Sequence, residues 1–116
     1  MRKAIAVLSF SFFAVQATMA AEITGYVSDA KCAASGAKAK TAAEWIKPAA
    51  FENCVKDCVN KEGSEAVFVT EDNKTLKFDA ASLEKMKAHL GHKVRVTGNV
   101  VGNVLKVDSV SMLKLQ

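Results

Sequence analysis

The sequence LGHKVRVTGNVVGNVLKVDSVSM, from Leu90 to Met112, decides the fold of this chain. Apolar and polar residues alternate along its first half, with Val94, Val96, Gly98 and Val100 in one set and Lys93, Arg95, Thr97 and Asn99 in the other. A period of two predicts a half-buried strand. Gly102-Asn103 then forms a turn that accepts positive φ angles. We therefore predict two long antiparallel strands, with a bulge at Asp108-Ser109, where the alternation breaks.

Three further strands are predicted upstream of this hairpin. The segment 22–29 alternates in the same way and predicts the first strand. The segment 65–79 predicts a second hairpin, because two apolar runs flank the polar turn 71–74. A helix capped by Asp79 or Ser82 should follow and run to about His89, where Gly91 ends it.

A helical insert at about residues 30–63 separates the first strand from the second. The segment 30–40 is rich in alanine, lysine and serine and predicts a surface loop. Thr41 and Glu44 match the capping box of a short helical turn, and Pro48 suits the first turn of the next helix. The segment 49–60 carries one apolar stripe at helical spacing, made of Phe51, Cys54, Val55, Cys58 and Val59. Both of its cysteines are therefore expected to face whatever the helix covers.

The predicted order of elements defines the fold class. Without the insert it is three strands, a helix and two strands, which is the order of the five-stranded OB barrel. We predict a mainly β, OB-like barrel with a helical insert, the order being β-(αα insert)-β-β-α-β-β. The alternative is a flat sheet with helices on one face, since strand order alone does not establish closure.

The N-terminus predicts export. Arg2 and Lys3 form a positive region, residues 4–15 are almost wholly apolar, and Thr18-Met19-Ala20 supplies the small residues of a cleavage site. This pattern is typical of a secretory signal peptide covering residues 1–20. The apolar run is shorter than the ~20 residues of a membrane-spanning helix. We therefore expect a single domain, residues 21–116, in the periplasm or secreted, with no membrane anchor after cleavage.

Charge and motifs exclude some function classes. The chain has 16 Lys+Arg and 12 Asp+Glu, and loss of Arg2 and Lys3 with the signal peptide leaves 14 basic residues, interspersed along the chain. A nucleic-acid-binding surface is therefore not supported. The sequence contains no nucleophile–base signature, paired-carboxylate pattern, phosphate-binding loop or haem motif. No catalytic residue is nominated, and an enzyme is the less favoured class.

Three cysteines are the strongest chemical feature. In an exported chain, pairing is the default, and a bridge from Cys32 to Cys54 or Cys58 would fasten the segment after the first strand to the helix. The spacing does not choose between the two partners. An alternative is a soft-metal site for zinc or copper made of the three thiolates, with His89 or His92 as further ligands. A reactive thiol in a redox accessory protein is the third possibility.

The leading functional hypothesis is a non-enzymatic binding module stabilised by one disulfide and without a cofactor. Its ligand would be a protein, a glycan or a small molecule at the barrel face. Two aromatic residues, Tyr26 and Trp45, are the candidates for that face, although such a tyrosine more often packs its ring and hydrates its hydroxyl.

Four segments carry a resemblance to a known family: GYVSDAKC at 25–32, CVKDCV at 54–59, VFVT at 67–70 and GHKVRVTG at 91–98. Together they make the chain similar to a family of small exported bacterial domains of unknown function, over nearly the whole of residues 21–116. The resemblance implies an OB-like barrel with a cysteine-bearing helical insert and no established activity. Family members often have a histidine shortly after the first cysteine. This chain has Gly36, Ala37 and Lys38 there, which argues against a four-ligand metal site.

Overall fold

The computed structural model describes residues 21–113, so the predicted signal peptide lies outside the described residues. Its strands are β1 (Ala21–Asp29), β2 (Ala66–Thr70), β3 (Thr75–Phe78), β4 (Lys93–Val101) and β5 (Val104–Leu113). Its helical elements are α1 (Ala30–Ser35), η1 (Ala42–Glu44), α2 (Pro48–Asn60), α3 (Ala80–Met86) and η2 (Lys87–His89). The prediction of a mainly β domain with five strands and a few helices is confirmed.

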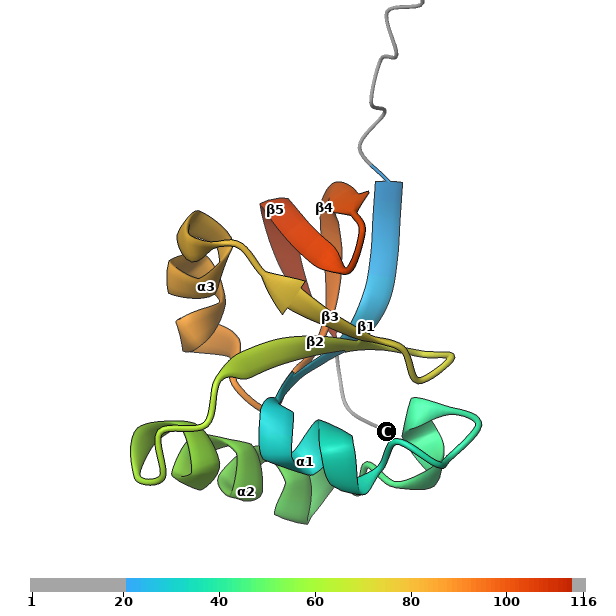
Figure 1. Ribbon diagram of the computed structural model, residues 1–116, viewed down its shortest axis with the longest axis vertical. Helices are drawn as coiled ribbons and strands as arrows, with labels where there is room; N and C mark the ends of the chain where they lie inside the picture. The colour runs from blue at the N-terminus through green and yellow to red at the C-terminus, as the bar shows by residue number, and fades with distance from the viewer. Residues whose placement is uncertain (1–20, 114–116) are drawn as a thin grey trace, which may run out of the picture.

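The strands pair in the closed order β1-β2-β3-β5-β4, and β4 pairs back with β1 (Figure 1). Four of the five pairings are antiparallel. The exception is the parallel contact of β3 with β5, which consists of Lys77 opposite Val104 and Phe78 opposite Leu105. These two short segments close the sheet on itself, in contrast to the flat-sheet alternative.

The β4–β5 hairpin has the turn and the bulge that the sequence predicts. Val101 pairs with Val104 around a two-residue turn, in which Gly102 has a φ of 64°. Thr97 pairs with Ser109 and Gly98 with Val107, so Asp108 is the extra residue of a bulge. The alternation buries the first part of β4 but not its end, where Val100 is 44% exposed.

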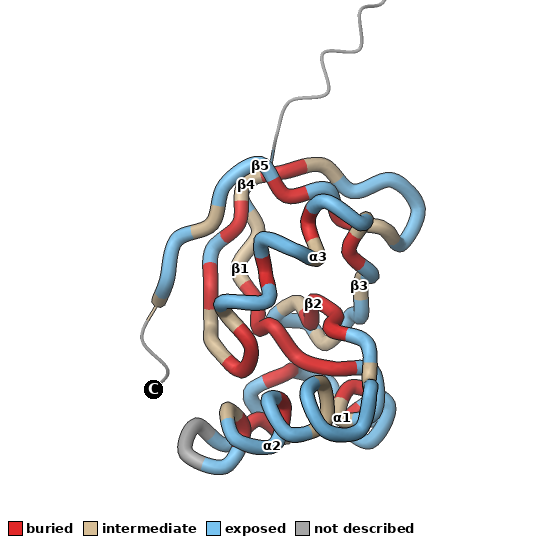
Figure 2. Tube along the Cα trace, turned by 90° about the vertical axis from the view of Figure 1, so that its left-hand side faces the viewer, coloured by how far each residue is buried: buried red, intermediate tan, exposed pale blue. Residues whose placement is uncertain are grey.

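The core lies inside the ring of strands and continues towards the insert (Figure 2). Its fully buried side chains include Val27, Phe68, Val69, Val94, Val96 and Leu105. The rings of Phe68 and Phe78 meet edge to face, with 6.2 Å between their centroids. Met86 of α3 is also fully buried, so the helical segment between β3 and β4 contributes to the same core.

The insert made of α1, η1 and α2 lies across one end of the strands, below them in Figure 1. Phe51 of α2 contacts the Tyr26 ring edge to face, with 6.1 Å between the centroids. Because the insert covers this part of β1, its last five residues are all buried, and the expected polar face of the strand is absent there. The prediction of a loop over 30–40 is wrong for its first half, which forms α1.

The prediction that both helix cysteines face the covered side is also wrong for Cys54, which is exposed. Phe51 and Val55 are buried and occupy the side of α2 that packs on the core. Cys54 lies beside them, at the edge of that stripe, and faces α1. Cys58, one turn further along, is half-buried.

Candidate functional site

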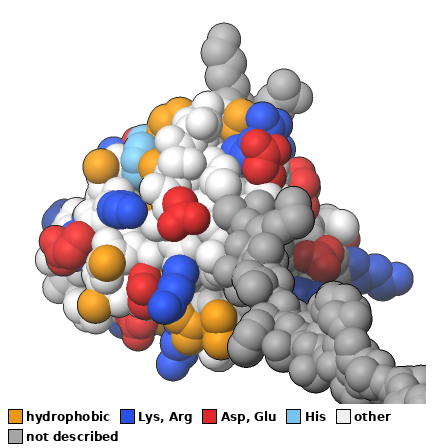
Figure 3. Space-filling view, turned by 90° about the horizontal axis from the view of Figure 1, so that it is seen from above, with side chains coloured by type: hydrophobic (Ala, Val, Ile, Leu, Met, Phe, Trp, Pro, Cys, Tyr) orange, Lys and Arg blue, Asp and Glu red, His pale blue; other side chains and the backbone are white. Residues whose placement is uncertain are grey.

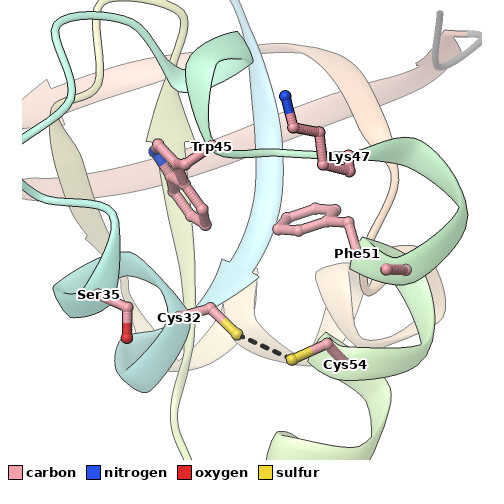
Figure 4. A pocket seen from close by; sticks show the side chains of 7 residues that line it. Cys32, Ser35, Trp45, Lys47, Phe51 and Cys54 are labelled. Carbon is pink, nitrogen blue, oxygen red and sulfur yellow. Dashed lines mark hydrogen bonds between the residues drawn. The ribbon is translucent and has the colours of Figure 1, made fainter.

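The three cysteines converge between α1 and α2. Their Sγ atoms all lie within 4.8 Å of one another, although Cys32 is 22 positions upstream of Cys54. The sulfurs of Cys32 and Cys54 are 3.3 Å apart (Figure 4). None of the three is bridged. The structure therefore brings together every cysteine that the sequence predicts for a thiol site, from two separate elements.

Asp29 holds Cys32 in place, and sequence reasoning missed it. Its Oδ2 atom accepts hydrogen bonds from the backbone N–H groups of Lys31 (3.0 Å) and Cys32 (3.2 Å), and thereby caps α1. The Ser64 hydroxyl donates to the same oxygen at 2.8 Å. The Asp29 side chain is fully buried, and its Oδ1 atom has no hydrogen-bond partner. An aspartate directly before the short run AKCAAS was the sequence signal for this cap.

The surroundings of the thiols disfavour their charged form. Burial raises the pKa of the Cys32 thiol, and the neighbouring Asp29 carboxylate and Cys54 thiol raise it further. Burial also raises the pKa of Cys58, and the negative charge of Asp29 adds to this effect. A buried carboxylate close to two thiols thus keeps them protonated in the free domain. A bound cation would reverse this balance, because thiolates are stabilised by positive charge.

An apolar hollow of about 290 Å³ opens beside the sulfurs of Cys32 and Cys54. It is lined by Cys32, Ser35, Trp45, Lys47, Ala50, Phe51 and Cys54. Figure 4 shows the two sulfurs at one side of it and the rings of Trp45 and Phe51 across from them. These rings meet edge to face at 5.9 Å. Cys58 does not line the hollow, so a ligand entering it would meet Cys32 and Cys54 first.

The two predicted ligand-face aromatics have different surroundings. Trp45 is half-buried and lines the hollow beside the sulfurs. Tyr26 is only 6% exposed, because its ring packs against Phe51, and the ammonium of Lys93 lies 5.7 Å from the ring centre. The structure therefore places Trp45, and not Tyr26, at the thiol site.

The two histidines lie apart from the cysteines. His89 and His92 do not belong to the group of converging ligand atoms, which consists of the three cysteines alone among residues 21–113. They lie near each other instead, with 6.4 Å between their ring centres, and each contacts a further side chain. The structure does not bring them together with the sulfurs as ligands of one ion.

No protein-family model, curated protein or solved structure matches this chain. Within the described range, no helix is long and apolar enough to span a membrane.

Proposed function

We propose that this chain is an exported, OB-like domain that binds a thiophilic metal ion through Cys32, Cys54 and Cys58. The observation that carries the proposal is the convergence of their Sγ atoms within 4.8 Å of one another. A thiolate–zinc bond is about 2.3 Å long, so two sulfurs that share one ion lie no more than about 4.6 Å apart. Small rotations of the three side chains are therefore sufficient to surround one ion.

The donor set favours Cu(I) over zinc. Soft thiolates suit both ions, but zinc in a structural site takes four ligands. The three thiolates supply three of these four ligands, and neither histidine belongs to the cluster. Zinc would require a water molecule or a partner's side chain in the fourth position. Cu(I) is accordingly the first ion to test, and zinc the second.

The fold supports the OB-like part of the proposal. The strand order, the helix between the third and fourth strands and the closed pairing are those expected of an OB barrel. In OB folds the loops between strands 1 and 2 and between strands 4 and 5 take part in ligand binding. The cysteine-bearing insert occupies the first of these connections. This is an analogy of fold, and the metal assignment depends on the sulfurs alone.

Metal content and thiol state test the proposal directly. The full chain should be exported, purified without oxygen and examined by elemental analysis and by alkylation with intact mass measurement. We expect about one equivalent of Cu(I) or zinc, and three alkylatable cysteines after the metal is removed by a chelator. Each bound ion should release protons, because the thiols become thiolates.

A second candidate is the binding module fastened by a disulfide between Cys32 and Cys54. The 3.3 Å between these sulfurs favours it, since a disulfide of about 2.05 Å requires them to approach by only about 1 Å. Closing this loop would stabilise the domain by about 3 kcal/mol on the chain-entropy model. Its ligand would be a small molecule, a glycan or a protein segment that enters the hollow beside Trp45.

Cys58→Ser separates the two candidates. It removes one thiolate of the metal site, so metal affinity should fall by at least about tenfold. It leaves the Cys32–Cys54 pair untouched, so the disulfide-fastened module should keep its stability. Cys54→Ser is the matched variant, because it removes a thiolate of the metal site and also prevents the Cys32–Cys54 disulfide. A metal-free exported chain with one bridge and one alkylatable thiol would contradict metal binding and support the module. Mixed disulfides with other proteins would instead support the redox function.

A further inference from the structure

A second group of potential ligands lies where η2 leads into β4 and β5 ends. His89 is the last residue of η2, and His92 directly precedes β4. Met112 is opposite Val94 in the β4–β5 pairing, one residue before the end of β5. Histidine atoms are visible at the surface next to hydrophobic side chains in Figure 3. None of these residues belongs to the cysteine cluster.

His89 and Met112 are already in contact. The Nδ1 atom of His89 lies 3.1 Å from the thioether sulfur of Met112. An imidazole in its neutral form has one nitrogen lone pair to give to an ion. Met112 is 51% exposed, so its side chain can be reached from solvent. Both donors are therefore available to a soft ion.

His92 has the hydrogen-bonding arrangement of a metal ligand. Its Nε2 atom lies 3.1 Å from Oε2 of Glu52, whose carboxylate is also held by Lys56 at 2.7 Å. When Nε2–H donates to this carboxylate, Nδ1 is left with a free lone pair, and that atom is buried without any partner. A carboxylate on the far nitrogen is the usual support of a metal-bound histidine.

Gly91 brings Glu52 and His92 together. Its φ is +78°, and a Cβ added there would overlap the Cα atom of Glu52. Only glycine accepts both the positive φ and this close approach of α2 to the start of β4. The backbone is thus arranged so that a carboxylate from the insert reaches a histidine of the barrel.

We propose that His89, His92 and Met112 form a second soft-metal site, selective for Cu(I) and separate from the three cysteines. Two imidazoles and a thioether suit Cu(I), whereas thioethers are poor ligands for zinc. Metal–imidazole nitrogen bonds are about 2.0–2.1 Å long. The histidine ring centres are 6.4 Å apart, a separation that two imidazoles bound to one ion can have. The site does not depend on the cysteine proposal.

Removing the thiols isolates this site. The full chain carrying Cys32→Ser, Cys54→Ser and Cys58→Ser should be titrated anaerobically with Cu(I) against a chromophoric Cu(I) chelator such as bathocuproine disulfonate. We expect one equivalent of Cu(I) to bind, and Met112→Leu to weaken it by at least tenfold. Met86→Leu is the matched control, because Met86 is fully buried in the core, and it should bind like its parent. Zinc should bind much more weakly than Cu(I).

A second measurement keeps the test decisive if the cysteine-free chain does not fold. The native chain should then bind one Cu(I) more than its Met112→Leu variant, and the methyl resonance of Met112 should shift when the last equivalent is added. Equal affinity of the Met112→Leu variant and its parent would overturn the proposal. So would equal binding of zinc and Cu(I), since the thioether would then have no role. Loss of the cysteine site alone would leave these results unchanged.

Discussion

The indole Nε1 of Trp45 donates a 2.8 Å hydrogen bond to Oδ1 of Asn73, 28 positions further along the chain. The amide nitrogen of Asn73 in turn donates to the carbonyl oxygens of Gly36 (2.9 Å) and Ala39 (2.7 Å). One side chain in the β2–β3 turn therefore connects two parts of the insert to the barrel. It also fixes the ring that lines the hollow beside the sulfurs.

Replacing Asn73 should loosen this connection. Asn73→Ala removes three hydrogen bonds and puts alanine at a φ of 66°, so we expect a loss of roughly 2–3 kcal/mol in the free energy of unfolding. Asn73→Gly is the control, because it removes the same bonds but accepts the positive φ. Denaturant unfolding followed by Trp45 fluorescence measures both. Equal stability of Asn73→Ala and the native chain would show that these bonds do not hold the insert.

The three thiols should react with iodoacetamide in a defined order. Cys54 is exposed, whereas Cys32 and Cys58 are half-buried and have raised thiol pKa values. Since the thiolate is the nucleophile, we expect Cys54 to be alkylated first in the metal-free, reduced chain. Trypsin separates the cysteines into peptides 32–38, 41–56 and 57–61, because the bond before Pro48 resists cleavage. Labelling of Cys32 ahead of Cys54 would contradict the described arrangement.

Local pattern was sufficient to predict the five strands of this fold and most of its helices, although not α1. The alternation from Val94 onward, the Gly102-Asn103 turn and the break at Asp108 each depend on neighbouring residues, and the structure has all three. The capping box is also present, with Thr41 N–H donating to Glu44 at 3.2 Å. Such features are encoded within a few positions, so a single sequence reveals them.

The site required contacts that no local pattern encodes. The parallel pairing of β3 with β5 involves only two residue pairs, and the sequence of neither segment identifies the other as its pairing partner. Cys32 approaches Cys54 because Asp29 caps α1 and Asn73 holds the segment after it, interactions that reach as far as 37 positions. The exposure of Cys54 was also not predictable from local pattern. Helical spacing places Cys54 on the apolar stripe of α2, but it does not indicate which residues of that stripe the core covers.

Gly98 is expected to tolerate no side chain. A Cβ at this position would overlap the backbone carbonyl oxygen of Lys106, opposite the bulge. Backbone atoms in a paired strand move less easily than a flexible side chain, so Gly98→Ala should destabilise the domain by about 3 kcal/mol. The control is Gly102→Ala, where the φ of 64° strains alanine but no atom lies in its way. Gly102→Ala should lower the free energy of unfolding by less than Gly98→Ala does. A larger loss for Gly102→Ala would contradict the close approach of β4 and β5.

Acid should destabilise the domain through three carboxylates whose pKa values are lowered in the folded state, those of Glu52, Asp72 and Asp79. Hydrogen bonds lower the pKa of each: that of Glu52 mainly through Lys56, that of Asp72 through Thr70 and that of Asp79 through Ser82. A carboxylate whose pKa is lower in the folded state binds its proton more readily in the unfolded chain. Each carboxylate therefore stabilises the fold fully at a pH above its pKa in the unfolded chain, which is 4.5 for glutamate and 3.8 for aspartate. This stabilisation is lost as the pH falls through the lower pKa that the same carboxylate has in the folded chain.

Asp79→Asn isolates one of these contributions. Asparagine also accepts the hydrogen bond from the Ser82 backbone at the start of α3, so the cap is kept while the titrating group is removed. The melting temperature of the variant should therefore fall less steeply than that of the native chain below about pH 4, while both curves run parallel above pH 5. Thermal unfolding at half-unit steps of pH measures this difference. Identical slopes below pH 4 would mean that the Asp79 carboxylate has the same pKa in the folded and unfolded chain, which its 3.0 Å bond from the Ser82 N–H argues against.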